Sequence, residues 1–349
     1  MHAPKGKAIE RMQVAITGAS GLLGANVAIL LLQQGIRVRC TRRGTSAVQH
    51  LAEFPIEWVS ADLEDREGLR QAFSGCDAVF HCAAAISYRR RPTPDITRTN
   101  VDGTRNVIAA IRAAGEGQTV PRLVHCSSVV TCAISTDGQP VDESKPWNFA
   151  DFGVDEAYSI TKRQAEEVVL AEVARGLDAV IVNPGYLLGP YDARPSSGRM
   201  IIQVIRRAAP GAPTGGNCFV DVRDVARGMI AAWQRGRRGE RYILGGHNLP
   251  YRELWALISK IAGTRPLSWA IPRPLALPVG WLGDLSQAIT GRESEINSVT
   301  VRYGYLDGYR FTSAKAEREL GYHLGPLEPA IRDAITWFQA HKMLPSRLC

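Results

Sequence analysis

Residues 17–24 read TGASGLLG and directly follow a short apolar run, QVAIT, at residues 13–17. The run predicts a buried strand, and the segment LLGANVAILLLQQG that comes next has helical length and ends at a glycine. Gly18, Gly21 and Gly24 permit a tight turn and a close approach of the backbone to a pyrophosphate. The helix N-terminus would offer free N–H groups and the positive end of its dipole. The stretch therefore predicts a dinucleotide-binding unit of strand, loop and helix.

The first half of the chain alternates apolar runs with helical segments. After RVRCT come IEWVSA, DAVFHCA, RLVHCSS and DAVIVNP, each bounded by polar or turn residues. This alternation predicts an α/β fold, a Rossmann-type doubly wound parallel sheet. We expect a dinucleotide-binding domain at 13–185 with a return segment near 217–246. A smaller interleaved substrate lobe is expected from 186–216 and 247–349, after a disordered extension at 1–12.

Composition and charge argue against several classes of protein. The 349 residues are 45% hydrophobic, and the formal net charge is +8. Seven cysteines are dispersed without CxxC or zinc-ligand spacing, so no metal site is predicted. Basic stretches are not interleaved with aromatic residues, as they are in proteins that bind single-stranded nucleic acid. The N-terminus lacks the apolar core of a signal peptide. The apolar run LALPVGWLGDL is too short to span a bilayer. We expect a soluble cytoplasmic protein whose basic surface is solvated or attracts an anionic ligand.

The stretch DEAYSITKRQAEE places Tyr158 and Lys162 four residues apart in a segment predicted to be helical. Residues at this spacing lie one turn apart on one face of a helix. A free tyrosine has a pKa of about 10, too high for efficient acid–base work at neutral pH. A neighbouring ammonium is expected to lower that pKa, so the spacing predicts an acid–base pair. The YxxxK pattern by itself is common, and its position after the strand-like HCSSVV is what supports the prediction.

Five short motifs, in chain order, resemble those of the extended short-chain dehydrogenase/reductases within the NAD-dependent epimerase/dehydratase superfamily. The glycine loop resembles TGxxGxxG, and ADL at 61–63 resembles the adenine-contacting acid and leucine. HCAAA from His81 resembles HxAA, NVDGTRNV from Asn100 resembles NxxGTxN, and NPGYLLGP from Asn183 resembles the loop whose proline contacts the nicotinamide carboxamide. The resemblance covers roughly 13–340. It is closest to dihydroflavonol reductase-like, 3β-hydroxysteroid dehydrogenase-like and hopanoid-associated epimerase-like members.

The resemblance implies roles for individual residues. Ser128 would polarise a substrate carbonyl, Tyr158 would act as the acid–base, and Lys162 would bind the nicotinamide ribose. Asn100 is expected to help orient water or backbone in a proton relay. Cofactor contacts are expected at Gly18, Ser20, Gly21, Leu22, Leu23, Asp62, Leu63, Cys82, Ala83, Ala84, Tyr158, Lys162 and Pro184.

Two arginines decide the predicted cofactor. An NAD enzyme usually has an acid at the end of the second strand, where it accepts hydrogen bonds from the ribose hydroxyls. In RVRCTRRGTS, Arg42 stands at that place and Arg43 follows it. Guanidinium groups suit a 2′-phosphate through charge-assisted, forked hydrogen bonds. We therefore expect NADP(H), with NAD(H) as the alternative if the arginines only face water.

The substrate class stays open at this point. Nucleotide-sugar enzymes commonly carry an arginine near the diphosphate where this chain has Asn217, an uncharged amide. Tyr88, Tyr186 and Tyr191 are expected to line an apolar substrate lobe with the segment around Trp281, or to fill the core of that lobe. We expect NADPH-dependent reduction of a ketone on a hydrophobic, aromatic or isoprenoid-like molecule, or the reverse oxidation. A nucleotide-sugar epimerase or dehydratase and a non-catalytic NADP-binding sensor are the alternatives, and two helices on one sheet face allow a homodimer.

Overall fold

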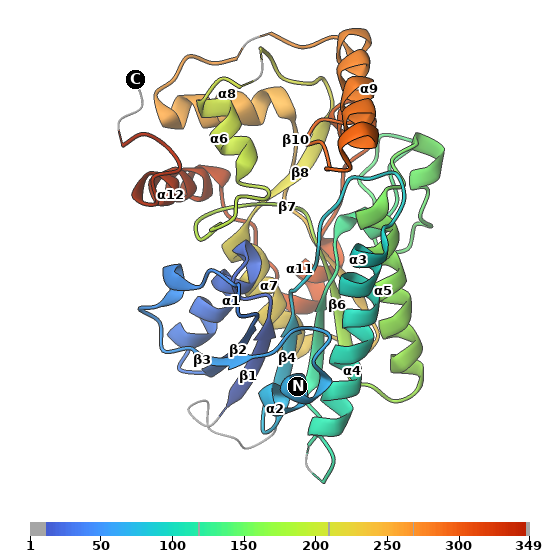
Figure 1. Ribbon diagram of the computed structural model, residues 1–349, viewed down its shortest axis with the longest axis vertical. Coiled ribbons are helices and arrows are strands. Elements are labelled where there is room, and N and C mark those ends of the chain that lie inside the picture. The colour runs from blue at the N-terminus through green and yellow to red at the C-terminus, as the bar shows by residue number, and fades with distance from the viewer. Residues whose placement is uncertain (1–11, 118, 209, 268, 347–349) are drawn as a thin grey trace.

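A sheet of seven parallel strands forms the centre of the computed structural model, which describes residues 12–346 except 118, 209 and 268 (Figure 1). The predicted disordered extension, 1–12, lies outside the described residues except for its last residue. The strand order across the sheet is β3 (Glu57–Ser60), β2 (Arg37–Arg42), β1 (Gln13–Thr17), β4 (Ala78–His81), β5 (Arg122–Cys126), β6 (Ala179–Pro184) and β9 (Arg241–Leu244).

The first strand lies inside the sheet rather than at its edge. β1 pairs in parallel with β2 on one side and with β4 on the other. The chain therefore builds outward from β1 to one edge of the sheet, and then crosses back to build the other half. In doubly wound sheets, ligands bind in the crevice at the carboxyl ends of the strands where this reversal occurs. Every residue of β1 and β6 is buried, as expected of strands covered on both faces.

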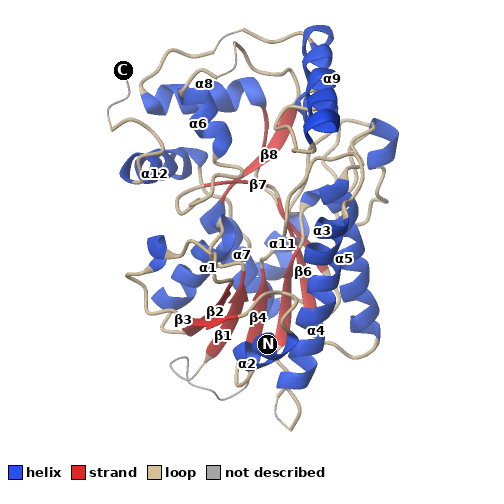
Figure 2. Ribbon diagram, in the orientation of Figure 1, coloured by secondary structure: helices blue, strands red, loops and turns tan. Residues whose placement is uncertain are grey.

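Helices cover both faces of the central sheet and confirm the predicted α/β fold (Figure 2). On each face, apolar side chains of strands and helices form a continuous core. On the first face, for example, the rings of Phe80 and Trp233 meet edge to face with centroids 6.0 Å apart. That face carries α1 (Leu22–Gln33), α7 (Val222–Arg235) and α11 (Ala314–Leu320), and the other carries α2 (Arg66–Phe73), α4 (Gly103–Ala114) and α5 (Ala157–Ala174).

A second, three-stranded sheet belongs to a smaller lobe beyond the carboxyl ends of the central strands (Figure 2). Its order is β10 (His247–Pro250), β8 (Gly216–Asp221) and β7 (Tyr186–Leu188). The chain enters this lobe after β6, leaves it along β8 and α7, and rejoins the central sheet as β9. The two parts of the protein are therefore interleaved in sequence. The remaining α-helices are α3 (Pro94–Thr97), α6 (Arg199–Ile205), α8 (Tyr251–Ala262), α9 (Arg273–Thr290), α10 (Ser298–Gly304) and α12 (Leu327–Ala340).

Helix α9 stands at the outer end of the smaller lobe (Figure 1). It has 18 residues, contains Pro278 in its interior, and buries only Gly280 fully. The element that it contacts most is α10. In the part of the chain that the structure describes, no helix has the length and apolar character needed to cross a membrane.

Candidate active site

The predicted catalytic side chains meet at the carboxyl end of β5. Ser128 lies two residues beyond the strand, and its Oγ accepts a hydrogen bond from the backbone N–H of Val130 at 3.4 Å. Tyr158 and Lys162 come from the first turns of α5. The Ser128 hydroxyl lies close enough to the Tyr158 phenol to lower its pKa. Lys162 Nζ donates to the carbonyl oxygen of Cys126 at 2.6 Å, so the three predicted residues lie in one place.

Burial controls the proton affinity of the Tyr158 phenol. It raises the pKa of Tyr158 above its ordinary value, and Cys126 adds to that rise, while the nearby Ser128 hydroxyl opposes it. This direction is opposite to the lowered pKa that the tyrosine–lysine spacing predicts. The ammonium of Lys162 is directed at a backbone carbonyl, and burial lowers the pKa of Lys162 itself. The lysine therefore does not offset the loss of water around the phenol.

The buried carboxylate of Glu156 caps the helix that carries the tyrosine. It accepts hydrogen bonds from the backbone N–H of Tyr158 and, at 3.0 Å, from that of Ser159. Tyr303, in α10, donates its hydroxyl to the same carboxylate at 3.0 Å. Burial raises the pKa of Glu156 to about 7. The start of α5 is therefore tied to the smaller lobe through a group that changes charge near neutral pH.

A second buried carboxylate lies one turn after Lys162 on the same helix. Glu166 accepts hydrogen bonds from Thr131 Oγ1 and from Asn183 Nδ2, both at 2.6 Å. Its other oxygen lies 3.2 Å from Nε of Arg241 in β9. Its negative charge raises the pKa of Lys162 and so opposes the effect of burial. This network joins α5, β6 and β9 behind the lysine and favours its charged form.

Asn100 fixes the loop that follows β4. Its Oδ1 accepts from the backbone N–H of Ala85 at 2.7 Å, and its Nδ2 donates to the Ala85 carbonyl oxygen at 2.9 Å and to Thr161 Oγ1 at 3.0 Å. Thr161 is the neighbour of Lys162 in α5. Asn100 therefore holds backbone, and its predicted part in ordering water stays a prediction.

Two buried histidines lie beside the lysine, between the sheet and α4. His81 Nδ1 is 2.7 Å from Thr17 Oγ1, and its Nε2 is 3.2 Å from Thr104 Oγ1. Neither ring nitrogen of His125 has a hydrogen-bond partner among the described residues. Burial and the charge of Lys162 lower the pKa of both rings, that of His81 to about 3. Both therefore stay neutral, which agrees with the interpretation of these residues as core.

Three glycines shape the loop between β1 and α1. Gly18 has a φ of 78°, and a Cβ there would lie 2.5 Å from the backbone nitrogen of Ala83. A Cβ on Gly24 would lie 2.4 Å from the carbonyl oxygen of Gly18. Gly21 differs, because it is exposed at the uncapped start of α1 and a Cβ there would approach nothing closer than 3.5 Å. The loop combines a packed underside with an open helix N-terminus, which fits a dinucleotide pyrophosphate. Among the neighbouring predicted contacts, Ser20 is partly buried, and Leu22 and Leu23 are buried.

The residues predicted to contact the adenosine end lie at one corner of the sheet. Arg42 is the last residue of β2, is exposed, and places its guanidinium 5.9 Å from the ring centroid of Trp58. Arg43 is also exposed, and neither arginine has an ion-pair partner among the described residues. Exposed Asp62 follows β3, and its Oδ1 accepts from the backbone N–H of Leu63. The corner thus offers two exposed arginines, one of which, Arg42, lies over an aromatic ring.

The loop after β4 and the end of β6 supply the other predicted cofactor contacts. The backbone N–H of Cys82 donates to the Thr17 carbonyl oxygen at 3.1 Å, and that of Ala83 donates to Thr17 Oγ1 at 3.4 Å. Ala84, which follows, is exposed. Pro184 is the buried last residue of β6. All four residues lie at the edge of the sheet that also carries the glycine loop.

Tyr88 follows Ser87, whose carbonyl oxygen accepts a hydrogen bond from the backbone N–H of Tyr158 at 3.1 Å. It contributes to the raised pKa of Tyr158, and its ring meets that of Tyr303 at a centroid distance of 6.3 Å. The carboxylate of Glu293 accepts a hydrogen bond from the backbone N–H of Tyr88 at 2.5 Å. Of the three predicted substrate tyrosines, Tyr88 is therefore the one whose loop contacts the backbone at Tyr158.

The other two tyrosines pack against apolar side chains, Tyr186 within the smaller lobe and Tyr191 between that lobe and the segment around Phe54. Tyr186 donates its hydroxyl to the carbonyl oxygen of Ser197 at 3.1 Å. Tyr191 lies between the rings of Phe54 and Trp337, with centroids 6.1 and 6.4 Å away. Both pack against the apolar core of α6, α8 and α12. This packing agrees with the alternative that they fill the core of the lobe.

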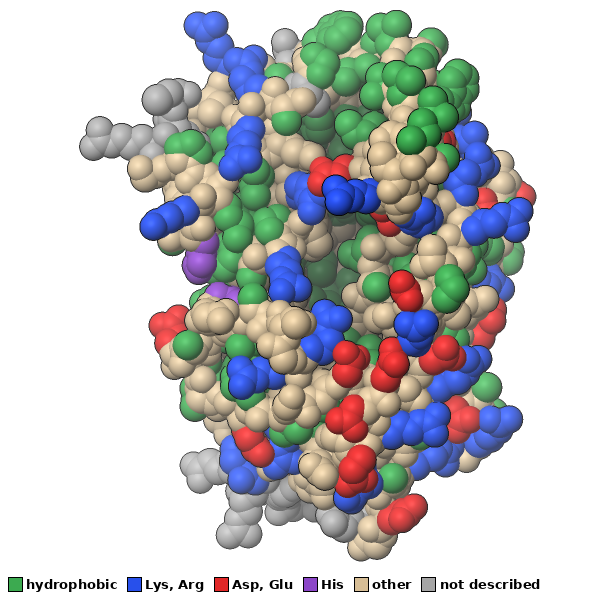
Figure 3. All heavy atoms as spheres, viewed as in Figure 1, with side chains coloured by type: hydrophobic (Ala, Val, Ile, Leu, Met, Phe, Trp, Pro, Cys, Tyr) green, Lys and Arg blue, Asp and Glu red, His purple; other side chains and the backbone are tan. Residues whose placement is uncertain are grey.

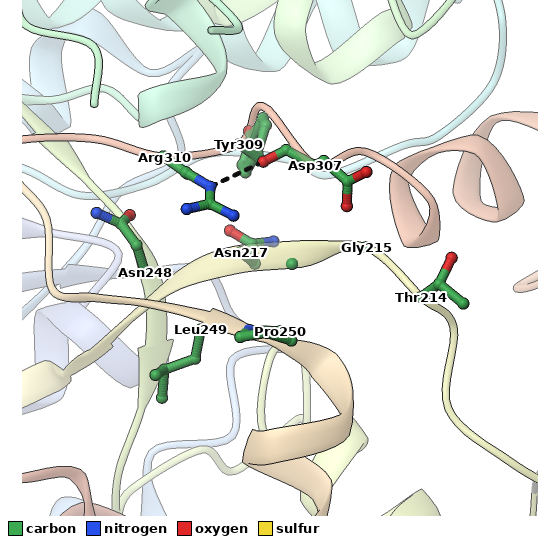
Figure 4. A pocket seen from close by; sticks show the side chains of 10 residues that line it. Thr214, Gly215, Asn217, Asn248, Leu249, Pro250, Asp307, Tyr309 and Arg310 are labelled. Carbon is green, nitrogen blue, oxygen red and sulfur yellow. Dashed lines mark hydrogen bonds between the residues drawn. The ribbon is translucent and has the colours of Figure 1, made fainter. Parts of the chain in front are cut away.

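A small pocket lies between β8, β10 and the loop that carries Arg310 (Figure 4). Asn217, at the place of the diphosphate-binding arginine, lines it and donates from Nδ2 to the Tyr251 hydroxyl at 3.1 Å. The exposed guanidinium of Arg310 faces the same pocket, and its Nε donates to the carbonyl oxygen of Asp307 at 3.1 Å. The pocket thus holds a cation that the sequence motif does not reveal.

The model of the NAD dependent epimerase/dehydratase family matches residues 14–245, which include the glycine loop, Ser128 and the Tyr158–Lys162 pair. This chain belongs to that family. It is therefore an NAD(P)-dependent oxidoreductase of the extended short-chain type. Among the described residues, no group of three or more His, Cys, Asp or Glu side chains is arranged to hold a metal ion.

Both reductases and epimerases are found among the similar proteins. A Synechocystis protein provisionally named a dihydroflavonol 4-reductase is 36% identical and aligns over 93% of this chain and 94% of its own length. A Stigmatella aurantiaca 4-hydroxy-2-methyl-3-oxo-4-farnesyl-3,4-dihydroquinoline-1-oxide ketoreductase is 33% identical, with 89% and 92% covered. The crystal structure of a Pseudomonas aeruginosa protein described as a nucleoside-diphosphate-sugar epimerase is 26% identical, with a TM-score of 0.77 and 95% and 98% covered.

Proposed function

We propose that the protein is an NADPH-dependent reductase that acts on a ketone of a hydrophobic small molecule. The observation that carries the proposal is the position of Ser128, Tyr158 and Lys162. The serine hydroxyl lies near the phenol, the lysine lies one helical turn further along α5, and the glycine loop lies at the same edge of the sheet. A hydroxyl pair beside a dinucleotide site suits proton transfer to a carbonyl oxygen.

The protein side chains would handle the oxygen and its proton. Bound NADPH would supply the hydride. Ser128 would donate a hydrogen bond to the substrate carbonyl oxygen and hold it beside the Tyr158 hydroxyl. Tyr158 would give its proton to that oxygen, and the raised pKa keeps the phenol protonated until then. Lys162 would hold the nicotinamide ribose, with Glu166 favouring its charged form.

The preference for NADPH rests on Arg42 and Arg43. Both are exposed at the end of β2 and have no carboxylate partner among the described residues. A 2′-phosphate would accept forked, charge-assisted hydrogen bonds from them. The adenine would lie near the guanidinium of Arg42 and the ring of Trp58 over which that guanidinium is placed. These features support NADPH over NADH as the preferred cofactor.

The hydrophobic character of the substrate rests on two observations. The tyrosine whose loop contacts the backbone at Tyr158, Tyr88, presents an aromatic ring rather than a charged side chain. The S. aurantiaca relative, by its name, reduces a ketone that carries a farnesyl chain. An apolar ketone of similar kind would be accepted at Tyr88 without the loss of hydration that a sugar diphosphate would suffer.

One observation favours a nucleotide-sugar epimerase or dehydratase as a second candidate. Arg310 brings a guanidinium to the pocket in which Asn217 stands at the usual arginine position. A cation there would suit a diphosphate. This candidate predicts conversion of a UDP- or dTDP-sugar without net consumption of NADPH.

A substrate panel separates these candidates. The purified chain would be given NADPH with aromatic, steroidal and isoprenoid ketones, and in parallel NAD⁺ with UDP- and dTDP-sugars. Oxidation of NADPH by an apolar ketone supports the proposal, while turnover of nucleotide sugars alone contradicts it. A chain that binds NADPH tightly but turns over neither set would instead be a sensor, the third alternative.

A further inference from the structure

Helix α9 is oriented in the reverse of the usual way for a surface helix. Its small and polar residues face the protein. A Cβ on Gly283 would collide with the carbonyl oxygen of Ile296, and Gly280 is buried against Ser298. Asp284 accepts a hydrogen bond from the backbone N–H of Ser298 at 3.2 Å. An ordinary surface helix buries its apolar side and exposes these residue types instead.

The apolar side of α9 faces outward. Leu275, Val279, Trp281, Leu282, Leu285 and Ile289 are all exposed, with Leu282 at 65% and Ile289 at 76% of full exposure. At 3.6 residues per turn they form one continuous face of the helix. Figure 3 shows the hydrophobic side chains gathered at the end of the molecule where α9 lies. Trp281, expected in the substrate lobe, is therefore part of the outer surface, because the glycines on the opposite side of α9 are what fit against the protein.

Basic side chains border this apolar face. Arg273 begins α9 and Arg292 follows its end, and both are exposed. Exposed Arg90 and Arg91 belong to the loop after β4, which is joined to the end of α9 where Arg89 donates to the Gly291 carbonyl oxygen at 2.6 Å. Apart from Arg89, these arginines have no ion-pair partner among the described residues.

The acidic residues at the same end of α9 are already engaged. Glu293 accepts hydrogen bonds from Ser87 Oγ at 2.7 Å and from the backbone N–H of Tyr88. Glu295 pairs with Arg199. The charge left over around the apolar face is therefore positive.

We propose that α9 docks on the surface of an anionic phospholipid bilayer. Its leucines, valine, isoleucine and Trp281 would enter the boundary between head groups and acyl chains, and the four arginines would contact lipid phosphates. A two-fold contact between copies of this chain would instead bring each basic border close to its own copy, which like charges oppose. Charge complementarity thus favours the bilayer over a second copy.

The docked helix would lie next to the reaction site. Glu293 holds the loop of Ser87 and Tyr88, and the Ser87 carbonyl oxygen accepts the backbone N–H of Tyr158 at 3.1 Å. A lipid-soluble molecule could pass from the bilayer to this loop without crossing water. The docking itself does not depend on which reaction the protein catalyses.

The test is co-sedimentation of the full chain with vesicles. Equimolar phosphatidylcholine and phosphatidylglycerol vesicles would be compared with pure phosphatidylcholine vesicles at low and high salt. We expect binding to the anionic vesicles that weakens with salt. The double variant that carries both Leu282→Gln and Leu285→Gln should have a partition coefficient that is lower by about ten-fold or more, because each leucine loses its burial in lipid. The double variant that carries both Arg273→Gln and Arg292→Gln should bind anionic vesicles more weakly, and its binding to pure phosphatidylcholine vesicles should not change.

The matched control is Val120→Gln with Leu324→Gln, two exposed apolar residues outside α9. These should leave the partition coefficient unchanged. Circular dichroism would show that all variants are folded. Absence of binding by the unaltered chain overturns the proposal. So does a homodimer, measured by light scattering, that the Leu282/Leu285 variant dissociates while vesicle binding is unaffected.

Discussion

The ammonium of Lys162 donates a hydrogen bond to the carbonyl oxygen of Cys126, 2.6 Å away and two residues before Ser128. The lysine and the serine thus meet at the same strand end, and Tyr158 lies one helical turn before the lysine on α5. Burial lowers the pKa of Lys162. The nearby Cys126 and Glu166 side chains raise that pKa and so favour the charged ammonium. The lysine is therefore one of the points at which α5 is attached to the sheet.

Replacing Lys162→Met should reduce kcat/KM by about 100-fold while the protein still folds, because methionine has similar length but cannot donate the hydrogen bonds that would hold a ribose. The KM for NADPH should rise in the same variant. Steady-state kinetics at varied NADPH measures both effects. Arg163→Met is the control, since this neighbouring side chain points outward to Glu167. Equal losses in the two variants would show that the lysine has no special role.

Cofactor choice should change when the two arginines at the end of β2 are removed together. In the double variant that carries both Arg42→Ala and Arg43→Ala, we expect the KM for NADPH to rise about ten-fold or more. The KM for NADH should stay nearly constant, because only NADPH has a 2′-phosphate that loses contacts. Arg37→Ala is the control, since Arg37 is exposed at the opposite end of the same strand. A parallel rise for both cofactors would contradict 2′-phosphate recognition.

The glycine loop should separate binding from stability. Gly24→Ala should lower the midpoint of thermal unfolding, because its Cβ would meet the Gly18 carbonyl oxygen at 2.4 Å. Gly21→Ala should leave that midpoint nearly unchanged but weaken NADPH binding, because its Cβ would enter the space over the helix N-terminus. Differential scanning fluorimetry and fluorescence titration with NADPH measure the two effects. Unchanged NADPH affinity in Gly21→Ala would place the pyrophosphate elsewhere.

The stability of the fold should depend on pH through Glu156. Its pKa is raised to about 7 in the folded chain, so between its unfolded value and about 7 the folded state holds a proton that the unfolded state has lost. This contribution to the free energy of unfolding is present at low pH and is lost as pH rises through about 7. Glutamine does not titrate, so the Glu156→Gln variant should not lose this contribution. The free energy of unfolding of the variant minus that of the unaltered chain should be greater at about pH 8 than at about pH 5, by on the order of 2 kcal/mol.

Urea unfolding of both proteins at the two pH values measures this difference. Asp137→Asn is a suitable control, because Asp137 is exposed and its pKa is lowered rather than raised. A Glu156→Gln difference that is the same at both pH values would contradict the raised pKa of Glu156.

Local patterns in the sequence predict much of the fold and site. The glycine loop, the apolar strands and the four-residue spacing of Tyr158 and Lys162 depend on neighbours in the chain, so the sequence carries their signal. The bond between Glu156 and Tyr303 joins residues 147 positions apart, and Glu166 and Arg241 are also far apart in the chain. Such contacts have no local signature, and they escaped prediction.

Two predictions failed because burial decides the outcome. The spacing of Tyr158 and Lys162 predicts a lowered tyrosine pKa, yet the depth of the phenol raises it. The apolar sequence around Trp281 predicts an inner lining, yet Gly280 and Gly283 are the residues that fit against the protein. A one-dimensional pattern gives a helix its two faces but does not say which of them is covered.

The most direct test of the account compares the unaltered chain with Tyr158→Phe for NADPH oxidation by the best ketone of the panel, with NADPH affinity measured in parallel. The account predicts that kcat falls by about 10²–10⁴-fold because the proton donor is gone, while the Kd for NADPH changes little. A Tyr158→Phe variant that keeps full turnover would contradict the central role of the phenol.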